Sequence, residues 1–267
     1  MTPAEHFFAK GWVQFDPEPV AKAWVTAASP LADEIVADPK HRADWLRCGG
    51  TWFAGVNVFP NDATGAVPDR SIPPLEGSAV AFIARVLGLE GVAWDQAQIS
   101  VCYPGYPQPG EDESDAAFRF RRDRAAAHVD GILPIGPDRR RMLGEAHGFV
   151  LGLPLNQTPP DAAPLVVWEG SHEIIRAAFR ERLEGIAPAD WAREDVTDAY
   201  TTARRAVFDR CPRVAITVPP GAAYIVHRLA VHGVAPWGPA GGQAPRSIAY
   251  FRPELELKDP AAWLDAA

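Results

Sequence analysis

The stretch "AAHVDGILP" (126–134) places a histidine and a carboxylate two residues apart among apolar neighbours. Because successive side chains of a strand point to opposite faces, His128 and Asp130 would lie on the same face of a strand. A charged group that is buried without a partner is costly, so this pair needs either a mutual hydrogen bond or a ligand. The simpler interpretation is a His–Asp hydrogen bond at a strand edge. The alternative is a metal ion, which requires a further ligand from elsewhere in the chain.

A second stretch, "YIVHRLAVHG" (224–233), offers that further ligand. Its two histidines, His227 and His232, are five positions apart, so in an unbroken strand at most one of them could point inward. We favour His232, because Gly233 and a turn-rich loop follow it. Two histidines and one carboxylate on one face form the ligand set of non-haem Fe(II) sites that keep open coordination positions.

The loop after His232 returns into the apolar run "RSIAYF" (246–251). This pattern predicts a hairpin that places His232 and Arg246 near the same end of adjacent strands. A guanidinium in that position can bind a carboxylate with two parallel hydrogen bonds. The alternative for Arg246 taken alone is a salt bridge on the surface.

The main rival for the third metal ligand is His172, at the end of "PLVVWEGSH" (164–172). The other interpretation of this stretch is that a strand ends here and a helix begins, with Ser171 as the N-cap and His172 in the first turn. His147 opens another apolar run and could support the site from behind the ligands. We treat His6 and His41 as structural or exposed.

The composition is that of a soluble globular enzyme or binding protein. Of 267 residues, 47% are apolar and 22% are charged, the usual balance for such proteins. The net charge of −8 argues against a nucleic-acid or anionic-membrane partner. Three widely separated cysteines suggest no disulfide framework, and no signal peptide or membrane-spanning run is evident. We therefore expect a cytoplasmic protein with small-molecule partners, and the oligomeric state is left open.

Short runs rich in β-branched and aromatic residues, separated by Gly and Pro, begin near residue 97. Such punctuation predicts a sandwich or barrel. We expect a single domain over 1–267, with a mainly helical N-terminal layer at 1–95, a β core at 96–255 and a helical insert at about 171–210. The fold class predicted is mainly β.

Four motifs in order resemble one family: H-x-D, then "PLVVWEGSH", then "LAVHG", then a late arginine. This order is similar to that of the phytanoyl-CoA dioxygenase family of Fe(II)/2-oxoglutarate-dependent oxygenases, as is the N-terminal "FFAKGWVQFDPEPVAKAW" (7–24). The resemblance covers most of the chain and implies a double-stranded β-helix, a jelly-roll or cupin-like core. It implies His128, Asp130 and His232 as the iron ligands, and Arg246 as the contact for the distal carboxylate of 2-oxoglutarate.

The resemblance also implies a reaction. We expect a dioxygenase that uses O2 and 2-oxoglutarate to hydroxylate a C–H bond of a small organic substrate, with succinate and CO2 as co-products. No catalytic residue beyond the metal ligands is predicted. One alternative is a non-catalytic cupin-like protein that binds or senses a metal or a carboxylate. Another is a zinc-dependent hydrolase with the same three ligands. The aromatic residues expected to form pocket walls are Tyr103, Tyr106, Trp168 and Trp237.

Overall fold

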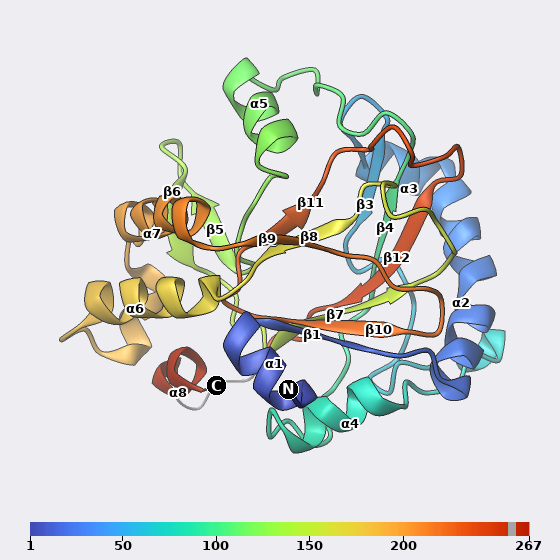
Figure 1. Cartoon of the computed structure of the whole chain (residues 1–267), viewed down its shortest axis with the longest axis horizontal. Coiled ribbons are helices and arrows are strands. Elements are labelled where there is room, and N and C mark those ends of the chain that lie inside the picture. The colour runs from blue at the N-terminus through green and yellow to red at the C-terminus, as the bar shows by residue number, and fades with distance from the viewer. Residues whose placement is uncertain (256–259, 267) are drawn as a thin grey trace.

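The computed structural model describes residues 1–255 and 260–266. Two antiparallel sheets form its centre (Figure 1), one of seven strands and one of three. In spatial order the larger sheet consists of β1 (Trp12–Phe15), β10 (Ala223–His227), β7 (Phe149–Pro154), β12 (Arg246–Phe251), β4 (Gln98–Cys102), β3 (Trp52–Gly55) and β2 (Leu46–Arg47). The smaller sheet consists of β11 (His232–Val234), β8 (Leu165–Trp168) and β9 (Arg213–Ile216).

The inner faces of the two sheets pack against each other. Val150 of β7, Tyr224 of β10 and Ile248 of β12 share one buried apolar cluster with Leu165 and Val167 of β8. These residues follow the alternation of strands, in which every second side chain points to the same face. Of the two predicted architectures, sandwich or barrel, the structure shows the sandwich, and its strands pair antiparallel.

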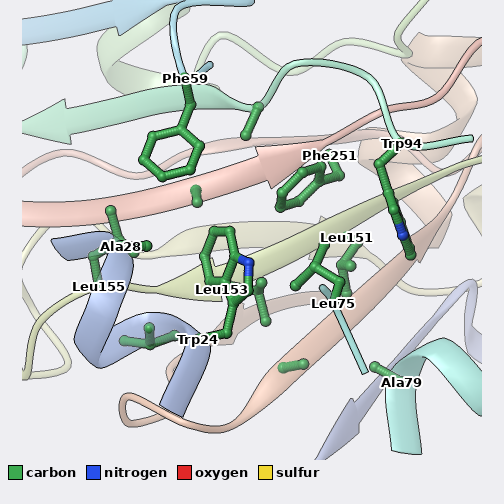
Figure 2. Packing of buried hydrophobic residues seen from close by; sticks show 14 of the residues in the cluster. Trp24, Ala28, Phe59, Leu75, Ala79, Trp94, Leu151, Leu153, Leu155 and Phe251 are labelled. Carbon is green, nitrogen blue, oxygen red and sulfur yellow. The ribbon is translucent and has the colours of Figure 1, made fainter. Parts of the chain in front are cut away.

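Helices from the N-terminal part cover the outer face of the larger sheet. Trp24 and Ala28 of the longest helix meet Leu151, Leu153 and Phe251 of the sheet (Figure 2), and the rings of Trp24 and Phe251 are 5.7 Å apart. Because this layer covers one face and the smaller sheet the other, β7 and β12 are buried at every position. The helices of this part are α1 (Pro3–Lys10), α2 (Pro19–Ala37), α3 (Pro39–Trp45), η1 (Pro68–Arg70) and α4 (Ser78–Arg85).

One expectation about proportions needs correction. "Mainly β" is too strong, because helices hold more of the described residues than strands do. The N-terminal part at 1–95 holds more helix than strand, and it also supplies β1, β2 and β3 to the larger sheet. Among the described residues, no helix has both the length and the apolar character needed to cross a membrane.

A group of helices covers the outer side of the smaller sheet (Figure 1). Ser171 was expected to be the N-cap of the first of them, but Gly170 is the N-cap, with φ of 78°, and Ser171 is the first helical residue. The Ser171 hydroxyl instead accepts a hydrogen bond from the Val231 backbone N–H at 2.8 Å. The helices of this group are α6 (Ser171–Leu183), η2 (Pro188–Arg193), α7 (Thr197–Arg210) and α8 (Pro260–Asp265). The remaining elements are α5 (Asp115–Asp123) and the hairpin of β5 (Ile132–Ile135) with β6 (Arg140–Leu143).

The expected hairpin between the strands of His232 and Arg246 is wrong. β11 pairs with β8 in the smaller sheet, whereas β12 lies between β7 and β4 in the larger one. The Gly/Pro-rich loop at 235–245 crosses from one sheet to the other and makes its own backbone hydrogen bonds, such as Trp237 N–H to Tyr106 C=O at 2.7 Å. A loop of this length does not impose hairpin pairing, so the composition alone could not distinguish the two outcomes.

Candidate metal centre

His128, Asp130 and His232 converge at one place between the sheets. One ligand atom from each of the three lies within 4.8 Å of the others. His128 Nε2 is 3.1 Å from Asp130 Oδ1, and His232 Nε2 is 3.7 Å from Asp130 Oδ2. Asp130 and His232 are buried, whereas the side chain of His128 is 49% exposed. The group is therefore open to solvent on the His128 side only.

A backbone bridge brings the two histidines together. His128 and His232 exchange both of their backbone hydrogen bonds, at 2.9 and 3.0 Å. The strand that we predicted across 126–134 is shorter in the structure. His128 makes only this isolated bridge, and β5 begins at Ile132. Asp130 instead lies in a turn that continues through Gly131, whose φ is 78°. The turn, not an extended strand, directs Asp130 toward the histidines.

Two glycines allow this close approach of backbones. A Cβ atom on Gly233 would lie 2.1 Å from the Ala125 carbonyl oxygen, and one on Gly131 would lie 2.1 Å from the Glu145 carbonyl oxygen. Both distances are far inside van der Waals contact with backbone atoms that have little freedom to move. Glycine is therefore required on both sides of the ligand group.

Hydrogen bonds fix the orientation of both imidazoles. His128 Nδ1 is 3.0 Å from the Ala126 carbonyl oxygen, and His232 Nδ1 is 2.9 Å from the Ala230 carbonyl oxygen. Because a carbonyl oxygen only accepts, each Nδ1 carries the proton and donates it. Each Nε2 is then the atom that faces Asp130 and the atom free to bind a metal. Histidine ligands of protein metal sites are commonly held in this way.

The pKa values of Asp130 and His232 depend on each other. Burial alone would raise the pKa of Asp130, but its interactions with His128 and His232 outweigh burial, so the pKa lies well below its ordinary value. Burial would lower the pKa of His232, yet the Asp130 carboxylate outweighs it and leaves that pKa raised. Without a metal, the site thus keeps an ionised carboxylate and favours a proton on His232. A metal cation would take the place of that proton.

Comparison with solved structures shows which known proteins share this fold. The non-heme alpha ketoglutarate dependent carbocyclase SnoK from nogalamycin biosynthesis superposes with a TM-score of 0.53 at 15% identity, covering 94% of this chain and 83% of SnoK. EvdMO1 superposes with a TM-score of 0.53 at 13% identity, covering 96% of this chain and 50% of EvdMO1. No family model and no curated protein sequence matches the chain.

The chain has the fold of the iron/2-oxoglutarate oxygenases. Its two sheets are the two halves of a double-stranded β-helix, as the resemblance to phytanoyl-CoA dioxygenases implied. At 15% identity the likeness establishes the fold and not the reaction.

In this oxygenase fold, the insert contacts the ligand-bearing segment. The Val129 backbone N–H, between the two ligands of the H-x-D motif, donates to the Tyr200 hydroxyl of α7 at 3.0 Å. Arg204 of α7 donates from Nη1 to the Ala127 carbonyl oxygen at 3.2 Å. With the Ser171 hydroxyl bound to Val231, the insert supports the chain on both sides of the centre. Sequence reasoning missed these residues, because nothing in their local sequence marks them.

A cavity of about 220 Å³ opens beside the three ligands. Its walls are mostly apolar, and of the four aromatic residues expected as pocket walls only Tyr106 lines it. Trp168 instead lies on the outer face of its strand, in the cluster formed with the insert. The other lining residues include Trp52, Ala54, Val56, Gln98, Ser100, Val150, Leu165, Val234, Tyr250 and Arg252.

Arg246 lies in a second cavity, of about 160 Å³. It is buried, and its Nε and Nη2 atoms have no hydrogen-bond partner among the described residues. Tyr224 lines this second cavity and Tyr250 lines the first, and their hydroxyl groups hydrogen-bond at 3.0 Å. The pair of tyrosines therefore connects the surroundings of Arg246 with those of the three ligands.

The rival His172 lies in a different histidine pair. Its ring centroid is 4.8 Å from that of His227, and its Nε2 donates to the Phe8 carbonyl oxygen at 2.9 Å. His227 Nδ1 accepts from the Leu229 N–H at 2.9 Å, and its Nε2 lies 3.0 Å from Arg176 Nη2. Burial lowers the pKa of both histidines, that of His227 well below its ordinary value. Neither belongs to the group of possible metal ligands.

Arg252 was also missed. Its Nη1 is 3.6 Å from Asp130 Oδ1, and it lines the first cavity. The signal was available, because Arg246 begins one apolar run, Tyr250 lies within it and Arg252 follows it, all separated by even numbers of positions. Such spacing places them on one face of the strand and its extension.

Proposed function

We propose that the protein is an Fe(II)/2-oxoglutarate-dependent dioxygenase that hydroxylates a C–H bond of a small organic substrate. The observation that carries this proposal is the convergence of two Nε2 atoms and one carboxylate, with both imidazoles oriented from behind. Two neutral imidazoles and a carboxylate suit ferrous iron and leave positions for other ligands. The oxygenase fold supports the same class of chemistry.

The residues present fit the metal. His128, Asp130 and His232 would hold it, since their ligand atoms already lie within 4.8 Å of one another. Ferrous iron, when bound with 2-oxoglutarate and O2, supplies the oxidation of the substrate C–H bond, with succinate and CO2 as co-products. The chain contributes an orienting hydrogen bond at each Nδ1 and apolar walls that exclude water.

Arg246 fits the co-substrate. A buried guanidinium with two unpartnered nitrogens is costly unless an anion binds it. The planar fork of arginine matches a carboxylate through two parallel hydrogen bonds. We therefore assign the distal carboxylate of 2-oxoglutarate to Arg246, with the Tyr224–Tyr250 hydroxyl pair beside its path to the metal.

The proposal is tested by adding Fe(II) and 2-oxoglutarate to the protein under anaerobic conditions. We expect the weak visible charge-transfer band of the iron–keto-acid chelate, and succinate after oxygen is admitted. Arg246→Ala should weaken 2-oxoglutarate binding by roughly tenfold or more, because a charged hydrogen bond is lost. His128→Ala should abolish the band, and His172→Ala should leave it.

Two results would overturn the proposal. A band without succinate, across a screen of small metabolites, would favour the non-catalytic binding protein. Tight zinc binding with hydrolytic turnover and no band would favour the hydrolase.

Product analysis completes the test, because SnoK is described as a carbocyclase: a product that gains one oxygen atom shows hydroxylation, and a product that loses two hydrogens shows another oxidation.

A further inference from the structure

Arg252 directs a positive charge into the cavity beside the metal ligands. Its nearest carboxylate oxygen is Asp130 Oδ1, 3.6 Å from Nη1, and its Nε is buried without a hydrogen-bond partner among the described residues. The side chain is 21% exposed. Arg252 thus lines the cavity and keeps one donor, Nε, without a partner among the described residues.

The backbone of Arg252 is held at both ends. Its N–H donates to both carboxylate oxygens of Asp95, at 2.9 and 3.1 Å. Its carbonyl oxygen accepts from His147 Nδ1 at 2.7 Å, and the His147 carbonyl oxygen accepts from Trp263 at 2.8 Å. The backbone is fixed in this way, and the contact of Nη1 with Asp130 places the guanidinium beside the candidate metal ligands.

Metal binding would remove the main partner of this guanidinium. Asp130 is the only carboxylate among the residues that line the cavity. Asp95 is near, but both of its oxygens bind the backbone of Arg252. Once a metal takes the charge of Asp130, the guanidinium faces a mostly apolar cavity without an acidic side chain. A cation in such a place is unfavourable unless a ligand supplies an anion.

We propose that Arg252 binds the carboxylate of the main substrate, and that this substrate is a small carboxylic acid with an apolar body. The apolar body follows from the walls, which include Trp52, Val150 and Leu165. The inference rests on the proposed function and names the substrate class of the same site. A carboxylate beside the metal has a second source, the keto-acid end of 2-oxoglutarate, and the experiment separates the two.

The test uses the protein loaded with Zn(II), which supports binding without turnover, and saturated with 2-oxoglutarate. Calorimetry compares matched acids and amides: benzoate with benzamide, phenylacetate with phenylacetamide, and hexanoate with hexanamide. We expect at least one acid to bind about tenfold more tightly than its amide, as a charge-assisted hydrogen bond implies. Arg252→Gln should remove that preference and change the affinity for 2-oxoglutarate by less than about threefold, because Arg246 holds the co-substrate. Arg205→Gln, at an exposed arginine of α7, is the matched control.

Three outcomes would overturn the inference: no acid preference in the unaltered protein, a preference that survives Arg252→Gln, or a tenfold loss of 2-oxoglutarate affinity in that variant. The last would assign Arg252 to the keto-acid end. If Arg252→Gln no longer holds Zn(II), Arg252→Lys replaces it and should reduce the preference at least threefold, since an ammonium lacks the fork of arginine. The Zn(II) and 2-oxoglutarate titrations report separately on the proposed function.

Discussion

The protein contains two pairs of adjacent, mutually tilted histidine rings that are almost alike in geometry and unlike in chemistry. The rings of His128 and His232 are 4.7 Å apart at 51°, and those of His172 and His227 are 4.8 Å apart at 40°. In the first pair each Nδ1 donates to a carbonyl oxygen, and each Nε2 faces Asp130. Proximity of two imidazoles therefore does not define a metal site.

The second pair uses its nitrogens for the fold. His172 donates to a carbonyl oxygen of α1, and His227 accepts from the Leu229 N–H while its other nitrogen lies against Arg176. Arginines surround this pair, which lowers the affinity for a cation, whereas a buried carboxylate completes the first pair. The two pairs differ in the charge of the side chains next to them. They also differ in whether a nitrogen lone pair of each imidazole is free to bind a metal ion.

The test with the largest expected effect replaces one histidine of each pair with alanine. His232→Ala should weaken Co(II) or Zn(II) binding by more than roughly 100-fold, because a metal ligand is lost. His172→Ala should leave metal affinity within about twofold and instead lower stability by a few kcal/mol, since a buried side chain leaves a void. Metal titration and urea unfolding measure the two effects. A reversal, with metal lost in His172→Ala and kept in His232→Ala, would show that our ligand assignment is wrong.

The second test uses a glycine next to each pair. A Cβ on Gly233 would meet the Ala125 carbonyl oxygen at 2.1 Å, and one on Gly11, whose φ is 81°, would meet His172 Nδ1 at 2.7 Å. Both changes to alanine should cost about 1–3 kcal/mol of unfolding free energy. Only Gly233→Ala should also weaken metal binding, by about tenfold or more. Equal loss of metal affinity in both variants would remove the distinction between the pairs.

The third test is the pH dependence of stability in the metal-free protein. Burial lowers the pKa of His227, so below about pH 6.5 the unfolded chain binds more protons and native stability falls. The pKa of His232 is raised, because Asp130 outweighs burial. Its contribution is therefore present below the unfolded pKa and is lost as the pH rises through the folded value.

Urea unfolding between pH 5 and 8 checks both signs. His227→Phe should reduce the loss of stability on acidification, and His232→Phe should increase it, by up to about 1.4 kcal/mol per pH unit for each group. Slopes that change in the same direction in the two variants would contradict the assignment of opposite protonation preferences.

The smallest expected effect comes from removing a hydrogen bond between the helical insert and the H-x-D segment. Tyr200→Phe removes the acceptor of the Val129 N–H, which should cost about 1 kcal/mol of stability and about tenfold in metal affinity. The control is Tyr103→Phe, a partly buried tyrosine that does not line the cavity. An unchanged metal affinity in Tyr200→Phe would show that the H-x-D segment keeps its shape without the insert.

The sequence was informative where chemistry is local. The H-x-D spacing and the glycine after His232 identified the three residues that converge, and the turn-separated apolar runs predicted a sandwich or barrel. It was less informative where contacts join distant segments. Tyr200 and Val129 are 71 positions apart, and Tyr200 is indistinguishable in the sequence from any buried tyrosine.

Two errors share one physical cause. In the strand predicted across 126–134, His128 forms a single bridge, Asp130 lies in a turn and β5 begins only at Ile132. The hairpin predicted between His232 and Arg246 is a crossing between sheets. Both depend on which backbone N–H and C=O groups form hydrogen bonds with each other. The conformational preference of a few residues contributes too little free energy to decide this pairing, because the burial of whole sheets contributes more. The convergence of the ligands was correct although the local route to it was not.

The two histidines of the candidate metal centre differ in their exposure to solvent, and reaction kinetics can detect this difference. With His128 half exposed and His232 buried, chelators and the imidazole reagent diethyl pyrocarbonate approach from one direction. Acylation should begin at His128, and a molecule that occupies the entrance should slow both loss of the ion and chemical modification. Protection from the reagent thus gives a simple assay for ligands, even before any product is known.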